Sequence, residues 1–264
     1  MKISVCTGRP VLEPCGLKDL NYQVDTYIGC EHCCWYCYVL GQAETDWSKE
    51  IRIHEDIEGR LSSEIEKVLP QTVYMGYHTD PYQPCESECL QTRKVLKLFL
   101  EKGFSASILT KSSLVTRDID ILKKMKNAAV SVSVAFNNDE TRRLFEGNTM
   151  DTGKRVEALA RLKDAGIKTG VLLCPVIPYV TNAMELIDGV QKYADTIWIY
   201  GLSINSNSDR NWLNVKQILD ENFQDSAPRI ENAVFSKEHP YWVELRNTLE
   251  DLKQNRQLNL NIHL

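Results

Sequence analysis

The sequence predicts an α/β fold: a partial (β/α)6 TIM-like barrel around a parallel sheet, with a helical C-terminal extension. Between about residues 20 and 200, short apolar segments of β type alternate with segments of helical periodicity. This alternation is typical of βαβ units, whose strands run parallel. Six units are fewer than the eight that close a barrel, so we expect the sheet to remain open.

The expected strands are apolar segments followed by turn-forming residues, and they span residues 22–28, 72–77, 104–109, 129–135, 167–173 and 196–200. The helices expected between them span residues 58–68, 86–102, 117–126, 154–165 and 182–193. In the segment 154–165, for example, apolar side chains recur at helical spacing, and Gly166 follows as a C-cap.

Three parts of the chain follow from this pattern. Residues 1–20 form an N-terminal segment, residues 21–203 form the barrel core, and residues 204–264 form a capping extension. The extension carries helical patterns over 211–222 and 237–254 and then a short apolar tail, 258–264. Because about sixty residues bury only a marginal core, we predict that the extension packs on the barrel instead of forming a separate domain.

Composition is that of an ordinary soluble globular protein, with 43% hydrophobic and 25% charged residues. No apolar run approaches the length of a membrane span, and the N-terminus lacks the pattern of a signal peptide, so we expect a cytoplasmic location and no membrane partner. The net charge of -5 gives no overall attraction to nucleic acid. Basic residues do cluster, and we expect each cluster to lie on the solvent-exposed face of a helix: Arg93, Lys94 and Lys97; Lys123, Lys124 and Lys126; Arg142 and Arg143.

Cysteine is abundant, with nine residues in 264. An odd number without a secretion signal argues against a disulfide framework. Four of the nine lie within eight residues: Cys30, Cys33, Cys34 and Cys37. Such crowding predicts a metal site.

In parallel α/β folds the chemistry lies at the C-terminal ends of the strands, on the loops that lead into the helices. The expected loops begin at Gly29, His78, Thr110, Phe136, Cys174 and Gly201. Nearly every unusual residue of the chain falls on one of these loops, and this coincidence is the main argument for an active site.

The first of these loops carries Cys30, Cys34 and Cys37 with the spacing C-x3-C-x2-C. Thiolates suit iron–sulfur clusters and zinc, and three ligands leave one metal position open, as a catalytic site requires. Cys33 is adjacent to Cys34 in the sequence, and neighbouring side chains rarely converge on one cluster, so Cys33 is poorly placed to be a fourth ligand. The alternative is a zinc knuckle in which Cys15 or His32 completes the set.

A cysteine triplet with an aromatic residue before its third member, placed after a first strand, resembles the radical S-adenosylmethionine (SAM) superfamily. Further stretches resemble its spore photoproduct lyase-like branch: residues 27–38, 76–84, 110–112, 116–120, 131–133, 144–146 and 175–178. The resemblance implies that the three cysteines bind a [4Fe–4S] cluster whose fourth iron is chelated by SAM. It also implies an external electron donor of flavodoxin or ferredoxin type, and a 5′-deoxyadenosyl radical that abstracts hydrogen from a substrate.

Further SAM contacts follow from the same resemblance. Thr79 and Asp80 could accept hydrogen bonds from the SAM ammonium group, although the Asp-Pro pair that begins at Asp80 is also ordinary turn chemistry. Lys111 could pair with the SAM carboxylate, and Ser133 could bind the ribose or the carboxylate. Tyr36 should lie near the adenine.

The hydrogen donor differs from the branch pattern. Spore photoproduct lyases use a cysteine on the second loop at the position that Tyr77 occupies here. Tyr77, Cys85 and Cys174 are therefore the candidate donors. Thiols such as Cys85 and Cys174 are more often simply buried than catalytic.

An open barrel leaves room for a large substrate. The branch suggests a nucleic-acid lesion, whereas the acidic net charge keeps a peptide or a small metabolite as a rival substrate. A competing hypothesis of another class is a non-catalytic iron–sulfur or zinc module that binds a partner.

Overall fold

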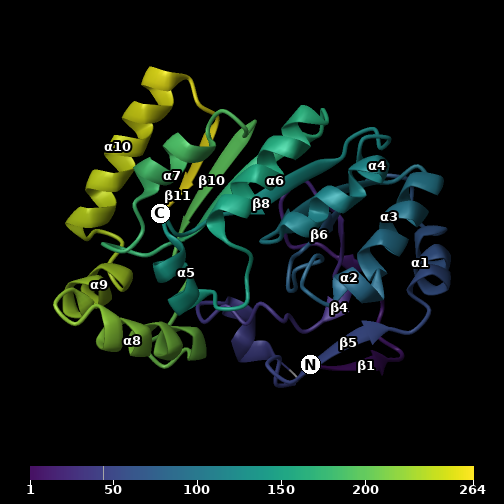
Figure 1. Ribbon diagram of the computed structural model, residues 1–264, viewed down its shortest axis with the longest axis horizontal. Helices are drawn as coiled ribbons and strands as arrows, with labels where there is room; N and C mark the ends of the chain where they lie inside the picture. Colours follow the sequence, from purple (N-terminus) through teal and green to yellow (C-terminus); the bar gives the residue numbers. More distant parts are fainter. Residues whose placement is uncertain (44) are drawn as a thin grey trace.

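The computed structural model describes residues 1–43 and 45–264 and contains one large sheet with helices packed on its outer face (Figure 1). The order of the strands across this sheet is β11-β10-β9-β8-β7-β6-β3-β2. All neighbouring strands are parallel except β2 and β3. Their bounds are β2 Glu13–Pro14, β3 Tyr22–Val24, β6 Thr72–Met75, β7 Ser105–Thr110, β8 Ala129–Ser133, β9 Lys168–Val176, β10 Thr196–Gly201 and β11 Leu260–His263. This mostly parallel, open sheet confirms the predicted partial barrel.

The predicted strand 22–28 is divided between two sheets. Its first part is β3, whereas β4 (Tyr27–Ile28) joins a small sheet with β5 (Glu50–His54) and β1 (Lys2–Cys6). The chain leaves the large sheet at Asp25, whose carboxylate accepts hydrogen bonds from the backbone amides of His78 and Thr79. This contact between distant segments has no signal in the local sequence pattern.

Helices cover the face of the sheet that carries the main core: α1 (Ile57–Ile65), α3 (Gln91–Glu101), α4 (Ile119–Leu122), α6 (Thr152–Asp164) and α7 (Ala183–Val190). The predicted helix 86–102 is interrupted at Leu90, which has a left-handed φ of 54°. The interruption separates α2 (Glu86–Cys89) from α3, and the Glu86 carboxylate caps α3 by accepting from the Thr92 and Arg93 amides. The predicted helix 117–126 is a 3₁₀ helix, η2 (Ser113–Asp118), followed by the short α4.

The C-terminal extension contains α8 (Arg210–Asn222), α9 (Ala227–Val234) and α10 (Pro240–Arg256). Helix α10 packs on the main core through Trp242, Leu249 and Leu252. Helices α8 and α9 lie side by side at the lower left of Figure 1 and pack on a second core with α5 (Asp139–Phe145). The apolar tail is the strand β11, which continues the parallel sheet beside β10, so this extension is not purely helical.

The inner face of the sheet carries small residues on β8 and β9. On β8, Val130 and Val132 are fully buried in the main core, whereas the alternate residue Ser131 points inward. A Cβ on Gly170 of β9 would lie 2.6 Å from Ser131 Oγ and 2.6 Å from the Trp198 ring, which places these side chains on the same inner face. Among the described residues, no helix is long and apolar enough to span a membrane.

Candidate active site

A cavity of about 170 Å³ lies at the C-terminal edge of the sheet, and residues from the first, second, third, fifth and sixth predicted units line it. Most of the predicted site residues meet there: Cys30, Cys34, Tyr36, Cys37, Tyr77, Thr79, Asp80, Lys111 and Cys174. Cys85 and Ser133 are not among the lining residues. Five of the six loops that the sequence placed at the strand ends therefore converge, whereas the loop that begins at Phe136 does not line the cavity.

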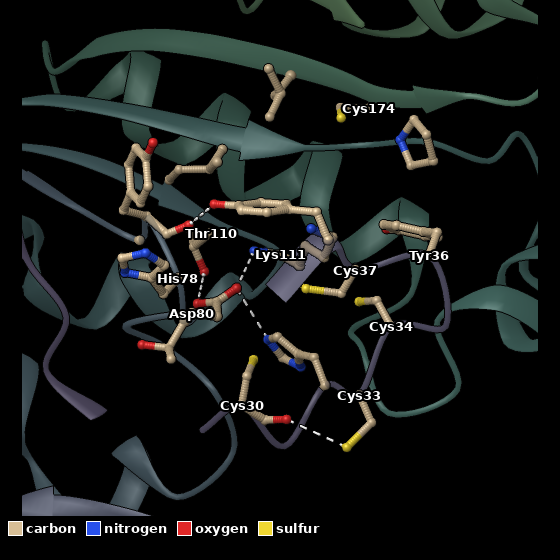
Figure 2. Close-up of a pocket in the computed structure, with 18 of the residues that line it drawn as sticks. Cys30, Cys33, Cys34, Tyr36, Cys37, His78, Asp80, Thr110, Lys111 and Cys174 are labelled. Atoms are coloured by element: carbon tan, nitrogen blue, oxygen red, sulfur yellow. Dashed lines mark hydrogen bonds and ion pairs between the residues drawn. The ribbon is translucent and has the colours of Figure 1, made fainter. Parts of the chain in front are cut away.

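The three cysteines of the C-x3-C-x2-C motif direct their sulfurs toward a common region, whereas the sulfur of Cys33 points away from it (Figure 2). Cys33 has a left-handed φ of 44°, and its thiol donates to the backbone carbonyl of Cys30 at 3.4 Å. Cys34 is buried against the second core. Adjacent residues thus face opposite sides of the loop, as expected for Cys33 and Cys34.

Burial raises the pKa of the Cys30, Cys34 and Cys37 thiols. The Asp80 carboxylate adds to the increase at Cys30, while the ammonium group of Lys111 lowers the pKa of Cys34 and of Cys37 and so opposes it. Thiols in this environment ionise only when a strong electrophile such as a metal binds them. Three converging soft donors therefore fit an iron–sulfur cluster.

Neither proposed zinc ligand completes a tetrahedral set. Cys15 is not among the residues that line the cavity. His32 is buried and lines the cavity, but Nδ1 lies 3.2 Å from the Asn148 carbonyl, and Nε2 faces Asp80 Oδ2 at 3.1 Å without hydrogen-bond geometry. The described residues thus offer three converging thiols and no fourth protein ligand, which disfavours the zinc knuckle.

Side-chain amides hold the cysteine loop in place. Gln83 accepts from the Glu31 amide at 2.7 Å and donates to the Gly29 carbonyl at 3.1 Å. Further amide donors reach loop carbonyls from other elements, namely Asn148 to Glu31, Asn211 to Tyr36 and Asn214 to Trp35. The sequence analysis missed these residues. A signal existed only for Gln83, in the segment 76–84 that resembles the family.

Internal donors occupy both carboxylate oxygens of Asp80 (Figure 2). Oδ1 accepts from Thr110 Oγ1 and from the Tyr82 amide, and Oδ2 accepts from the Lys111 amide and contacts His32. Burial alone would raise the pKa of Asp80, but the charge of His32 and these hydrogen bonds outweigh it and lower the pKa to about 2. Asp80 therefore joins the second, third and cysteine loops.

Thr79 and Lys111 lie beside Asp80 and retain binding capacity toward the cavity. The Thr79 hydroxyl donates to the Tyr27 carbonyl at 3.1 Å, which leaves its oxygen able to accept. The Lys111 ammonium lies 5.8 Å from the centre of the Tyr36 ring and has no salt bridge among the described residues. It is a cation available to an anionic ligand.

A buried ion network supports Tyr36. The Tyr36 hydroxyl donates to the Glu146 carboxylate, which also pairs with the Arg155 guanidinium at 2.6 Å. Arg155 donates in addition to the Ser133 carbonyl at 3.0 Å. Ser133 Oγ is fully buried and has no hydrogen-bond partner among the described residues.

The prediction that Arg142 is solvent-exposed is wrong: it is 2% exposed, because its guanidinium donates to the carbonyls of Glu146 and Thr149.

The three candidate hydrogen donors are placed differently. Cys174 lines the cavity at the end of β9, and burial raises its pKa to about 11 despite the nearby Lys111. Tyr77 also lines the cavity, but its hydroxyl is directed at Gly16. Cys85 lies in a separate small core with Tyr27 and Ile51, away from the residues that line the cavity.

Comparisons with known proteins identify the family. The model of the Radical SAM superfamily matches residues 24–189. An uncharacterized protein of Methanocaldococcus jannaschii is 26% identical over 252 residues, which cover 94% of this chain and 93% of that protein. A spore photoproduct lyase of Clostridium acetobutylicum is 25% identical over 182 residues, which cover 67% of this chain and 53% of the lyase.

The fold also matches a solved spore photoproduct lyase mutant with bound AdoMet and dinucleoside spore photoproduct. The TM-score is 0.60 at 17% identity, and the match covers 83% of this chain and 66% of the lyase chain. The family model spans well over half of the sequence, so a non-catalytic module is no longer the competing hypothesis. The chain belongs to the radical SAM superfamily and is an enzyme of that class, related to spore photoproduct lyase.

Proposed function

We propose that Cys30, Cys34 and Cys37 hold a [4Fe–4S] cluster at which the enzyme cleaves SAM reductively. The observation that carries this proposal is the convergence of these three sulfurs on one cavity while the neighbouring Cys33 points away. When bound, the cluster and SAM supply a 5′-deoxyadenosyl radical that abstracts hydrogen from a substrate.

Different residues around the cluster bind different parts of SAM. Lys111 pairs with the carboxylate of SAM, since its ammonium faces the cavity. The Thr79 oxygen accepts from the SAM ammonium. Asp80 positions its neighbours instead of touching SAM, because it accepts from the Lys111 amide and pairs with His32. Tyr36, held by Glu146, forms the wall near the adenine.

Cys174 is the thiol best placed to return hydrogen to a product radical. It lies on the cavity wall opposite the cysteine loop, at the end of β9. Its raised pKa keeps it protonated at neutral pH, as a hydrogen-atom donor must be. Ser133, with its unpartnered buried hydroxyl, remains a candidate contact for the SAM ribose.

Radical SAM enzymes need an external reductant, and we propose a flavodoxin or a ferredoxin for this one. The substrate is a nucleic-acid lesion or, alternatively, a peptide or a small metabolite. The relationship to spore photoproduct lyase favours the lesion. The acidic net charge favours the alternatives.

The test is cluster reconstitution followed by a SAM cleavage assay under anaerobic conditions. Protein reduced with dithionite should convert SAM to 5′-deoxyadenosine, and Cys34→Ala should lose both the cluster absorbance and the product. Cys33→Ala is the matched control and should keep both, because its sulfur is directed away from the site. A Cys34→Ala protein that still cleaved SAM would refute the assignment of the ligands.

A further inference from the structure

Three ligating side chains outside the cysteine loop gather at the edge of the large sheet, and none of them is assigned to the cluster or to SAM, although His78 also lines the cavity. They are Glu13 on β2, Asp25 after β3 and His78 on the loop after β6. One carboxylate oxygen of each acid and one ring nitrogen of His78 lie within 4.8 Å of one another, and all three residues are partly buried. Residues far apart in the sequence are thus brought to one point.

A fourth side chain is directed into this group. Gln23 lies opposite Glu13 in the antiparallel β2–β3 pair, so their side chains share a face of the sheet. Gln23 is only 2% exposed, and its Oε1 has no hydrogen-bond partner among the described residues. Its amide nitrogen lies 3.4 Å from His78 Nδ1. A buried amide oxygen without a partner is costly unless a donor or a cation satisfies it.

The spacing of the polar atoms around His78 Nδ1 indicates which kind of atom must lie between them. His78 Nδ1 lies 2.7 Å from Asp25 Oδ2, a separation that requires a hydrogen on this nitrogen or a cation between the two atoms. With a cation there, Nδ1 presents its lone pair to the ion, whereas the Gln23 amide nitrogen, 3.4 Å from Nδ1, is a hydrogen-bond donor and cannot bind it. Turning the amide over places Oε1 at this point instead, and the two amide orientations have the same shape.

The charge of the group is compatible with a cation. Glu13 and Asp25 contribute two negative charges, and the Arg9 guanidinium, 3.2 Å from Glu13 Oε1, offsets one of them. With His78 as a neutral ligand, one negative charge remains. The donor set consists of carboxylates, one imidazole and one amide oxygen, with no sulfur.

We propose that Glu13, Asp25, His78 and the Gln23 amide oxygen bind one divalent metal ion of the Mn²⁺, Fe²⁺ or Zn²⁺ class. Mixed oxygen and imidazole ligands suit these ions, whereas a thiolate set suits an iron–sulfur cluster. The ion would link the N-terminal segment, through Glu13, to the loop that carries His78 and Thr79. This site is distinct from the cysteine loop and does not depend on the proposed SAM chemistry.

The probe is Mn²⁺, because it prefers oxygen and nitrogen ligands to thiolates. Cluster-loaded protein in the oxidised, EPR-silent state is titrated with MnCl₂, and the six-line EPR signal measures the free ion. The expected result is one Mn²⁺ bound per chain. Protein that leaves all of the Mn²⁺ free would overturn the proposal.

Two substitutions locate the ion. Glu13→Gln should weaken Mn²⁺ binding at least about tenfold, and Gln23→Glu should tighten it, since a carboxylate replaces the neutral amide. Asp25 is left unchanged, because its carboxylate also holds the His78 and Thr79 amides.

Glu58→Gln is the control, since Glu58 is an exposed carboxylate on α1. Cluster absorbance reports that each variant is folded, and Gln23→Glu decides the question if Glu13→Gln does not fold. Affinities that are the same in Gln23→Glu and in the unsubstituted protein would refute the site.

Discussion

The two walls of the cavity differ in how completely their polar groups are satisfied. On the wall built by the cysteine loop, each oxygen of Asp80 has a partner, and Glu146 is fully buried and paired. On the opposite wall, Cys174 carries a neutral thiol among the apolar side chains of Leu172, Pro175 and Leu202.

This difference indicates which wall binds the cofactor and which wall faces the substrate. A wall whose supporting carboxylates are already held can position a cluster and SAM with little reorganisation. A wall of neutral, mostly apolar side chains constrains its ligand less. The structure therefore supports a specific proposal for the cofactor and a broad one for the substrate.

The largest expected effect comes from breaking the buried ion pair behind Tyr36. Arg155→Met leaves the Glu146 carboxylate buried and uncompensated, so the free energy of unfolding should fall by about 3–5 kcal/mol. Urea denaturation followed by circular dichroism measures this change. Lys216→Met, which breaks an exposed pair with Asp220, is the control and should cost at most about 1 kcal/mol. Equal effects of the two substitutions would show that the wall is not held by this network.

A smaller effect concerns Asp80 and acid. Its pKa in the folded protein is about 2, below the 3.8 of an unperturbed group, so the stabilisation is present above pH 4 and is lost as the pH falls through 2. The shift corresponds to about 2 kcal/mol. Urea denaturation of the metal-free protein at pH 5 and pH 2 should therefore show a smaller acid-induced loss for Asp80→Asn than for the unsubstituted protein. Glu58→Gln, an exposed carboxylate, should leave that loss unchanged, and an unchanged loss in Asp80→Asn would contradict the role of this network.

The smallest expected effect lies where the two walls meet, at Lys111. Lys111→Met removes the cation that faces the cavity and should weaken SAM binding about tenfold, or about 1.4 kcal/mol, with the cluster retained. Equilibrium dialysis of cluster-loaded protein with labelled SAM measures the affinity. Lys97→Met, an exposed lysine of α3, is the matched control. If both variants bound SAM equally well, Lys111 would not be a SAM ligand.

The sequence determined the fold class, because apolar periodicity is a local property that six successive βα units repeat. It also determined the cysteine triplet, since ligand spacing on one loop is local as well. The family followed from that triplet and from short stretches between residues 25 and 180, and the family model confirms it over residues 24–189.

Only the tertiary structure decided which polar residues are available for chemistry. The sequence predicts a SAM contact at Asp80, and only the structure shows that donors from the cysteine loop and the third loop hold this carboxylate. The sequence predicts an exposed Arg142, yet it is buried and donates to the carbonyls of Glu146 and Thr149, which follow α5. The strand β11 and the group formed by Glu13, Gln23, Asp25 and His78 also depend on contacts between distant segments. Hydrogen-bond saturation and burial are set by which segments meet in space, and local sequence carries no record of that.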